Sequence, residues 1–200
     1  MLLTDSQRDA LAEVVNIGFG RAAATLSELT GQRVLIQVPQ VEIVEVRDLG
    51  QTLDRLVQGE VATVHQIFSG PIAGDALLLL DYDSAIALST LLSAGRQAGA
   101  RLDAADREVL TEVGNILLNA CLGTFSNMLD VRISFSVPRL HVDALRGLLD
   151  SLVIERIEVQ HVLIIYATFR LQESLVNGYI LIALGVSSLD RLLQAVTDLG

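Results

Sequence analysis

The chain has 200 residues, of which 51% are hydrophobic and 19% charged, so it holds enough apolar side chains for a packed core. A net charge of −10, with only 14 Lys and Arg residues spread along the chain, argues against binding to a nucleic-acid backbone. The one cysteine, Cys121, has no partner for a disulfide, which indicates a reducing compartment and predicts a cytoplasmic protein.

The apolar segments do not resemble membrane anchors. The N-terminal stretch MLLTDSQRD turns polar after three residues, unlike a signal peptide. The longest apolar runs, ALLLL and YILIALGV, have the length of strands rather than of membrane spans. The sequence therefore predicts no membrane insertion.

The first predicted helix spans residues 9–26. Thr4 and Gln7 match a capping box ahead of its periodic apolar run. Gly18 lies in the middle of the apolar face, where we expect the missing side chain to let another backbone approach closely. The predicted apolar face consists of Leu11, Val14, Val15, Gly18, Ala22, Thr25, Leu26 and Leu29.

A narrow polar stripe lies opposite this face. It consists of Asp9, Glu13, Asn16 and Gly20, which fall within about 60° of each other at about 100° per residue. An ordinary solvated face would explain the first three residues. Gly20 is costly inside a helix, and it would leave room for a partner that docks beside Asn16.

The elements that follow are predicted from β-branched runs, turn residues and amphipathic spacing. In the first half they are an alternating strand pattern at 33–46, strands at 61–68 and 75–82, a helix at 83–94 and a joint at 95–101. In the second half they are a long helix, a strand pattern at 132–145, strands at 153–158, 161–171 and 178–185, and a helix at 187–198. Each strand pattern contains a proline, which belongs at a sheet edge or a bend.

The two halves resemble each other at an offset of 99 residues. Twelve of the forty-one positions of residues 3–43 are identical to those of residues 102–142. The second polar stripe consists of Glu108, Glu112, Asn115 and Asn119, and Pro138 is the counterpart of Pro39. A shared pattern of this kind argues against the explanation that the polar stripe is an ordinary solvated face.

The predicted fold class is α/β (α+β), a pseudo-two-fold duplicated unit with a largely antiparallel sheet and two long helices that carry the motifs. Two halves of about 95 residues, about 1–97 and 98–200, would leave strand edges that pair well with each other. We therefore expect one domain over residues 1–200 with a shared sheet. Two independent domains are the alternative.

The remaining candidate sites are weak. His65, His141 and His161 have no spacing typical of metal ligands and are predicted to be structural, so no metal is expected. The GFG sequence in the first helix lacks the preceding strand and the third glycine of a dinucleotide loop. No cofactor of its own is predicted.

The pattern Asp9-x3-Glu13-x2-Asn16-x22-Pro39 resembles the signature of the CheC/CheX/FliY family of chemotaxis phosphatases, and its duplicated form resembles the CheC members. The family implies a phosphatase that acts on the phosphorylated receiver protein CheY, with CheD as a partner in many organisms. Mg²⁺ is expected on the receiver, not on this chain. The second copy matches at Glu112, Asn115 and Pro138 but has Glu108 where the family has Asp or Ser.

A receiver acyl phosphate is labile, so a phosphatase mainly has to place a water in line with the phosphorus. Asn16 and Asn115 would position that water, and Glu13 and Glu112 would pair with a receiver lysine. Asp9, Glu108 and the two prolines would support the motif. A non-catalytic adaptor for CheY or CheD and a structural protein of the flagellar-switch type are the alternatives.

Overall fold

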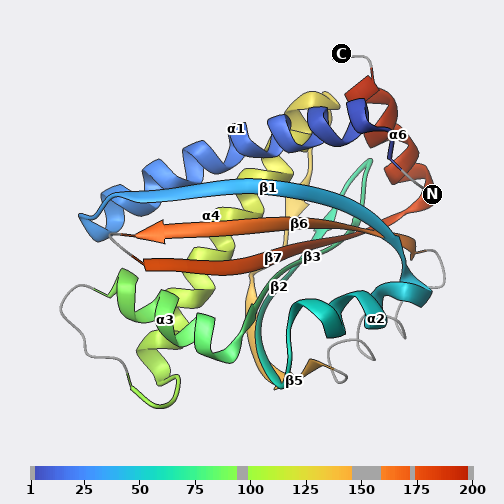
Figure 1. Ribbon diagram of the computed structural model, residues 1–200. Coiled ribbons are helices and arrows are strands. Elements are labelled where there is room, and N and C mark those ends of the chain that lie inside the picture. Colours follow the sequence, from blue (N-terminus) through green and yellow to red (C-terminus); the bar gives the residue numbers. More distant parts are fainter. Residues whose placement is uncertain (1–2, 94–98, 146–158, 172–173, 198–200) are drawn as a thin grey trace.

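The computed structural model describes residues 3–93, 99–145, 159–171 and 174–197 (Figure 1). The helices are α1 (Asp5–Thr30), α2 (Val46–Leu56), α3 (Tyr82–Leu92), α4 (Ala104–Met128) and α6 (Val186–Thr197). The strands are β1 (Val34–Glu45), β2 (Glu60–Ser69), β3 (Gly74–Asp81), β4 (Ser134–Phe135), β5 (Arg139–Ala144), β6 (Val159–Leu171) and β7 (Ser174–Gly185). The predicted fold class, helices with a largely antiparallel sheet, is confirmed.

The side chains on the two faces of the sheet belong to two separate hydrophobic cores. Leu77 and Leu78 are neighbours on β3 but lie in different cores, because successive side chains of a strand point to opposite faces. The larger core packs the sheet against α1, α3, α4 and α6, and the smaller core packs it against α2. Helices α1 and α4 therefore bury one face and leave the other toward solvent.

In the described part of the chain the strands form one seven-stranded sheet in the order β1-β6-β7-β3-β2, with both β4 and β5 paired to β2. All of these pairs are antiparallel. Strand β1 of the first half pairs with β6 of the second, and β5 of the second half pairs with β2 of the first. Each half thus contributes a strand to the ladder of the other, the arrangement that a shared sheet requires. That the halves fold as a single domain stays a prediction.

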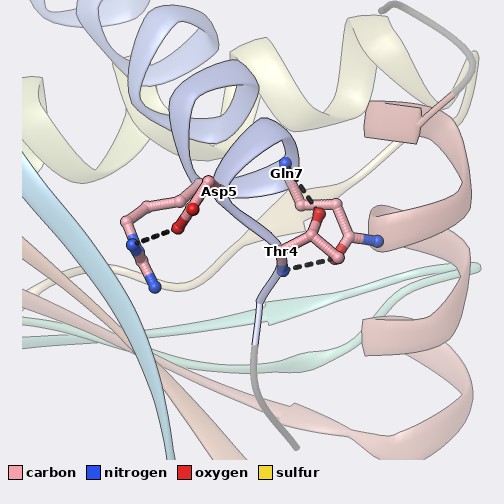
Figure 2. Close-up of polar contacts among 4 residues, drawn as sticks. Thr4, Asp5 and Gln7 are labelled. Carbon is pink, nitrogen blue, oxygen red and sulfur yellow. Dashed lines mark hydrogen bonds and ion pairs between the residues drawn. The ribbon is translucent and has the colours of Figure 1, made fainter.

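Helix α1 begins at the predicted capping box. Thr4 Oγ1 accepts a hydrogen bond from Gln7 N at 3.2 Å, and Gln7 Oε1 accepts one from Thr4 N at 3.1 Å (Figure 2). Asp5 lies in the first turn, where a negative charge favours the helix dipole, and its carboxylate pairs with Arg8 at 3.0 Å. Helix α4 begins with a capping box of the same kind. Local sequence therefore determines where both motif helices start.

Helices α1 and α4 approach closely at Gly18, as predicted. A Cβ atom built there would lie 2.6 Å from Thr124 Oγ1 and 2.9 Å from the backbone oxygen of Ala120. No side chain fits between the two helices at this point. Two residues of the predicted apolar face are not buried, however, because Thr25 is exposed and Leu29 is 64% exposed. Both lie near the C-terminal end of α1, where Leu26 is still buried.

The structure contains a helix that the sequence analysis did not predict, α2. Leu49 and Leu53 of α2 are buried one turn apart and fill the smaller core. Gly50 and Thr52 are weak helix formers, so the spacing of the two leucines was the available signal. The helix covers the face of the sheet opposite α1 and α4.

The strand predicted at 132–145 is interrupted in the structure. It forms β4 and β5, separated by a segment that contains Pro138, which has no N–H to donate to a ladder. Strand β1 remains continuous across Pro39, although its register with β6 shifts between Gln37 and Gln40. Pro39 thus lies on β1, an outermost strand of the sheet, and Pro138 lies at the break between β4 and β5, positions at an edge and at a bend as expected.

The strand predicted at 153–158 lies outside the described residues. Helix α4 is long and apolar enough to span a membrane by length and composition, but 44% of its most apolar window is buried inside the protein, and core helices of soluble proteins pass the same test.

Candidate functional site

The first motif lies on the solvent-facing side of α1. Asp9, Glu13 and Gly20 are exposed and Asn16 is partly buried. The helix presents them in this way because its opposite face, including Phe19, is buried in the larger core. The motif therefore forms a ridge in which Asn16 is the residue closest to the body of the protein.

Asn16 is held by the backbone of the neighbouring strand. Its Oδ1 accepts a hydrogen bond from Val38 N at 3.2 Å. Val38 lies in the register shift of β1, where it has no paired residue on β6, and Pro39 follows it. The irregularity at the proline thus frees a strand N–H, which turns toward the helix instead of the ladder. This contact explains in physical terms why an asparagine and a proline separated by 22 residues form one motif.

The Val38 bond determines what the carboxamide can offer to a ligand. An amide oxygen has two lone pairs, so one remains after Val38 is bonded. Among the described residues, no protein group accepts a hydrogen bond from Asn16 Nδ2, and this atom is not buried. Asn16 can therefore donate two hydrogen bonds and accept one, from an orientation fixed by the strand.

Open surface surrounds the carboxamide. A Cβ atom built at Gly20 would meet nothing within 4 Å. Ile17, which adjoins Asn16 on the helix, is 50% exposed. A small glycine, an exposed apolar side chain and the Glu13 carboxylate together form a surface on which a protein partner could dock.

The second motif lies on α4. Glu108 and Glu112 are exposed, and Asn115 is partly buried like its counterpart. Asn115 Oδ1 accepts a hydrogen bond from Asn119 Nδ2 at 2.8 Å, one turn further along the same helix. Pro138 lies outside the strands, between β4 and β5. The two motifs share an exposed glutamate and a partly buried asparagine but differ in what holds the asparagine.

The sequence analysis did not identify Val38 as a site residue. The available signal was its position before Pro39, repeated as Val137 before Pro138. The hydrogen bond itself joins residues far apart in sequence and required the structure.

Cys121 is unsuited to nucleophilic chemistry. The side chain is buried in α4, and burial raises the pKa of its thiol far above the ordinary value. The thiolate is the reactive form of cysteine, so this group stays inert in the folded protein.

The histidines lie on strands. His65 Nε2 lies 2.9 Å from Asp75 Oδ1 across the β2–β3 ladder. His141 is exposed on β5 and His161 partly buried on β6. Their structural role stays a prediction.

Comparison with known proteins places the first motif in a described family. Residues 7–43 match the sequence profile of the CheC-like family, and this range contains Asp9, Glu13, Asn16 and Pro39. The chain is 28% identical over 129 residues to CheC1 of Halobacterium salinarum, which carries the provisional name of a CheY-P phosphatase. It is 26% identical over 142 residues to the flagellar motor switch phosphatase FliY of Bacillus subtilis.

The extent of these matches differs. The first covers 64% of this chain and 65% of its relative, and the second covers 70% of this chain and 36% of its relative. The chain thus spans less than two thirds of the length of either relative. The crystal structure of Thermotoga maritima FliY matches with a TM-score of 0.78 and 21% identity, over 99% of both chains. This match shows that the fold is shared.

Proposed function

We propose that this chain, which belongs to the CheC/CheX/FliY family, hydrolyses the aspartyl phosphate of a phosphorylated CheY-type receiver. One observation carries the proposal: Asn16 is fixed by Val38 with its amide group free, and the exposed Glu13 carboxylate lies one turn before it. The names of both relatives support the substrate.

Asn16 would act on the water and on the phosphoryl group. The remaining lone pair of Oδ1 accepts a hydrogen from the attacking water, while Nδ2 donates to a phosphoryl oxygen. A carboxamide is neutral, so it approaches the charged phosphate without the repulsion of a carboxylate. Because Val38 already fixes the side chain, little ordering remains to be done when the receiver docks.

Glu13 would anchor the receiver. Its exposed carboxylate is suited to pair with a cationic side chain next to the acyl phosphate. Asp9, one turn earlier, would extend the same contact. The open surface at Gly20 would let the receiver approach the helix closely enough for Asn16 to reach the phosphorus.

The receiver supplies the Mg²⁺ that neutralises its phosphoryl group, so this chain needs no metal of its own. The Asn115 and Glu112 pair would form a second site of the same kind. A cytoplasmic location without membrane insertion fits this substrate, and CheD is a further candidate partner. A non-catalytic adaptor that only binds the receiver is the competing proposal.

The decay of phosphorylated receiver tests the proposal. We expect Asn16→Ala to lower the rate substantially and Asn16→Ala/Asn115→Ala to abolish acceleration, because losing one positioned hydrogen-bonding group in such a site costs roughly 10²–10³ in rate. Asn127→Ala, at an exposed position on α4, is the matched control. Full acceleration by the double variant would refute the role of the carboxamides, and tight receiver binding without acceleration by the unaltered chain would favour the adaptor.

A further inference from the structure

We propose that Asn119 is a positioning residue of the second site. Asn119 gives Asn115 the hydrogen bond that the backbone of β1 gives Asn16. The inference rests on the proposed function of the two asparagines. The two sites would then perform the same reaction with the same atom held by different donors. Asn119 does not itself contact the substrate in this proposal.

The same carboxamide atom is engaged in both sites. Asn16 Oδ1 accepts from Val38 N at 3.2 Å, and Asn115 Oδ1 accepts from Asn119 Nδ2 at 2.8 Å. In each case a lone pair of the oxygen and both N–H bonds remain for a ligand. The donor can therefore be exchanged without changing what the asparagine offers to the phosphoryl group and the water.

The strand cannot supply this donor at the second site. Ser136 is tied to β2 by three hydrogen bonds: its N donates to Ile67 O, its Oγ accepts from Ile67 N, and its O accepts from Gln66 Nε2, each at 2.9 Å. The next residue, Val137, is 82% exposed, and no hydrogen bond joins it to Asn115. Val137, the counterpart of Val38, therefore does not lie against the helix as Val38 does.

A side-chain difference inside the sheet accounts for this displacement. Gln66 is 1% exposed and precedes Ile67, the residue that lies opposite Ser136. In the other half, Gln37 is the counterpart of Ser136 and pairs with Thr168, so the residue in the place of Gln66 is Ala167. Alanine has no amide to hold a strand backbone, so β1 is free to bring Val38 to Asn16. Gln66 holds the backbone of Ser136 instead.

The helix position that supplies the donor also differs between the halves. Gly20 occupies the position on α1 that corresponds to Asn119 on α4. Glycine has no side chain to donate, and none is needed where Val38 holds the asparagine. Each site thus has one donor to its Oδ1, from the strand in the first and from the helix in the second.

The other end of the Asn119 amide argues against a merely structural role. Asn119 Oδ1 is buried and has no hydrogen-bond partner among the described residues. An unpaired buried acceptor costs stability, so an alanine here removes a penalty while it removes the donor to Asn115. We therefore expect activity and stability to respond differently to the substitution.

The test uses the full chain with the first site silenced by Asn16→Ala. Adding Asn119→Ala should lower kcat for the phosphorylated receiver about tenfold, the loss expected for one hydrogen bond, while KM changes less than about twofold. The midpoint of urea unfolding should stay the same or rise. Asn119→Gln keeps a donor at the i, i+4 distance and should restore part of kcat.

The outcomes separate this inference from the proposed function. An unchanged kcat in Asn16→Ala/Asn119→Ala overturns the inference, and so does an Asn16→Ala variant with no activity left for Asn119 to support. A fall in kcat with a parallel loss of folding also overturns it, because the effect would then be structural. Full activity of Asn16→Ala/Asn115→Ala would instead refute the proposed function on which the inference rests.

Discussion

The close approach of the two motif helices at Gly18 provides a quantitative test of the structure. We consider Gly18→Ala, which adds a single methyl group where α1 crosses α4. That carbon would lie 2.6 Å from Thr124 Oγ1 and 2.9 Å from Ala120 O. The hydroxyl of Thr124 already donates to Ala120 O at 2.8 Å, so turning it away sacrifices this bond. The backbone oxygen of Ala120 cannot move without shifting α4.

Two opposing effects determine the result. Replacing a glycine inside a helix by alanine stabilises it by up to about 1 kcal/mol. Forcing an extra carbon into a filled contact costs about 1–3 kcal/mol, and these distances are well below ordinary van der Waals contact. We therefore expect Gly18→Ala to lower the free energy of unfolding by up to about 2 kcal/mol.

Gly123→Ala is the matched control, because Gly123 lies inside α4 and a Cβ atom there meets nothing within 4 Å. This variant should be stabilised by up to about 1 kcal/mol. Urea unfolding followed by circular dichroism measures both variants against the unaltered chain. If Gly18→Ala is stabilised as much as Gly123→Ala, the two helices do not pack as the structure has them.

Three further predictions concern the anchor, the shared sheet and pH. Glu13→Ala should raise KM for the phosphorylated receiver more than it lowers kcat, which saturation kinetics would show, and equal effects on both would remove the distinction between anchor and water-positioning residue. A fragment of residues 1–97 should be insoluble, unfolded or dimeric by light scattering, because β1 loses its partner β6, and a stable folded monomer would contradict this. Burial and the hydrogen bond to Glu42 at 2.6 Å raise the pKa of Tyr166, so its contribution to stability is complete below about pH 10 and is lost as pH rises further. Tyr166→Phe should accordingly lose less stability than the unaltered chain in that range of a pH series of urea unfolding, and an identical loss would contradict the assignment.

The parts of the fold that sequence predicts well are those determined by neighbouring residues. The capping box at Thr4 and the helical period located α1 and the polar stripe with the exposed Glu13 and the partly buried Asn16. The close approach at Gly18 followed from a glycine on an otherwise apolar face. Helix α2 escaped prediction because Gly50 weakens its local signal, whereas the sheet beneath supplies much of its stabilisation.

The parts that sequence could not predict depend on contacts between distant segments. The bond from Val38 to Asn16 requires the register shift of β1 against β6, which a proline alone does not specify. In the second site, Asn119 was visible on the polar stripe, one turn from Asn115. Asn119 takes the place of a strand donor because the buried Gln66 holds the backbone of Ser136. Nothing in the local sequence pattern connects Gln66 to the motif.

The exchange of strands between the halves also affects the order in which the ladder can form during synthesis. About 113 residues separate the end of β1 from the start of β6, the strand with which it pairs. At about 5–20 residues per second, a ribosome takes roughly 6–23 s to add them. Throughout that interval the nascent chain carries β1 with no ladder partner, and only the helices of the first half can cover its apolar side chains. We therefore expect a newly made first half to expose the edge of β1, and the sheet to close only once β6 has been made.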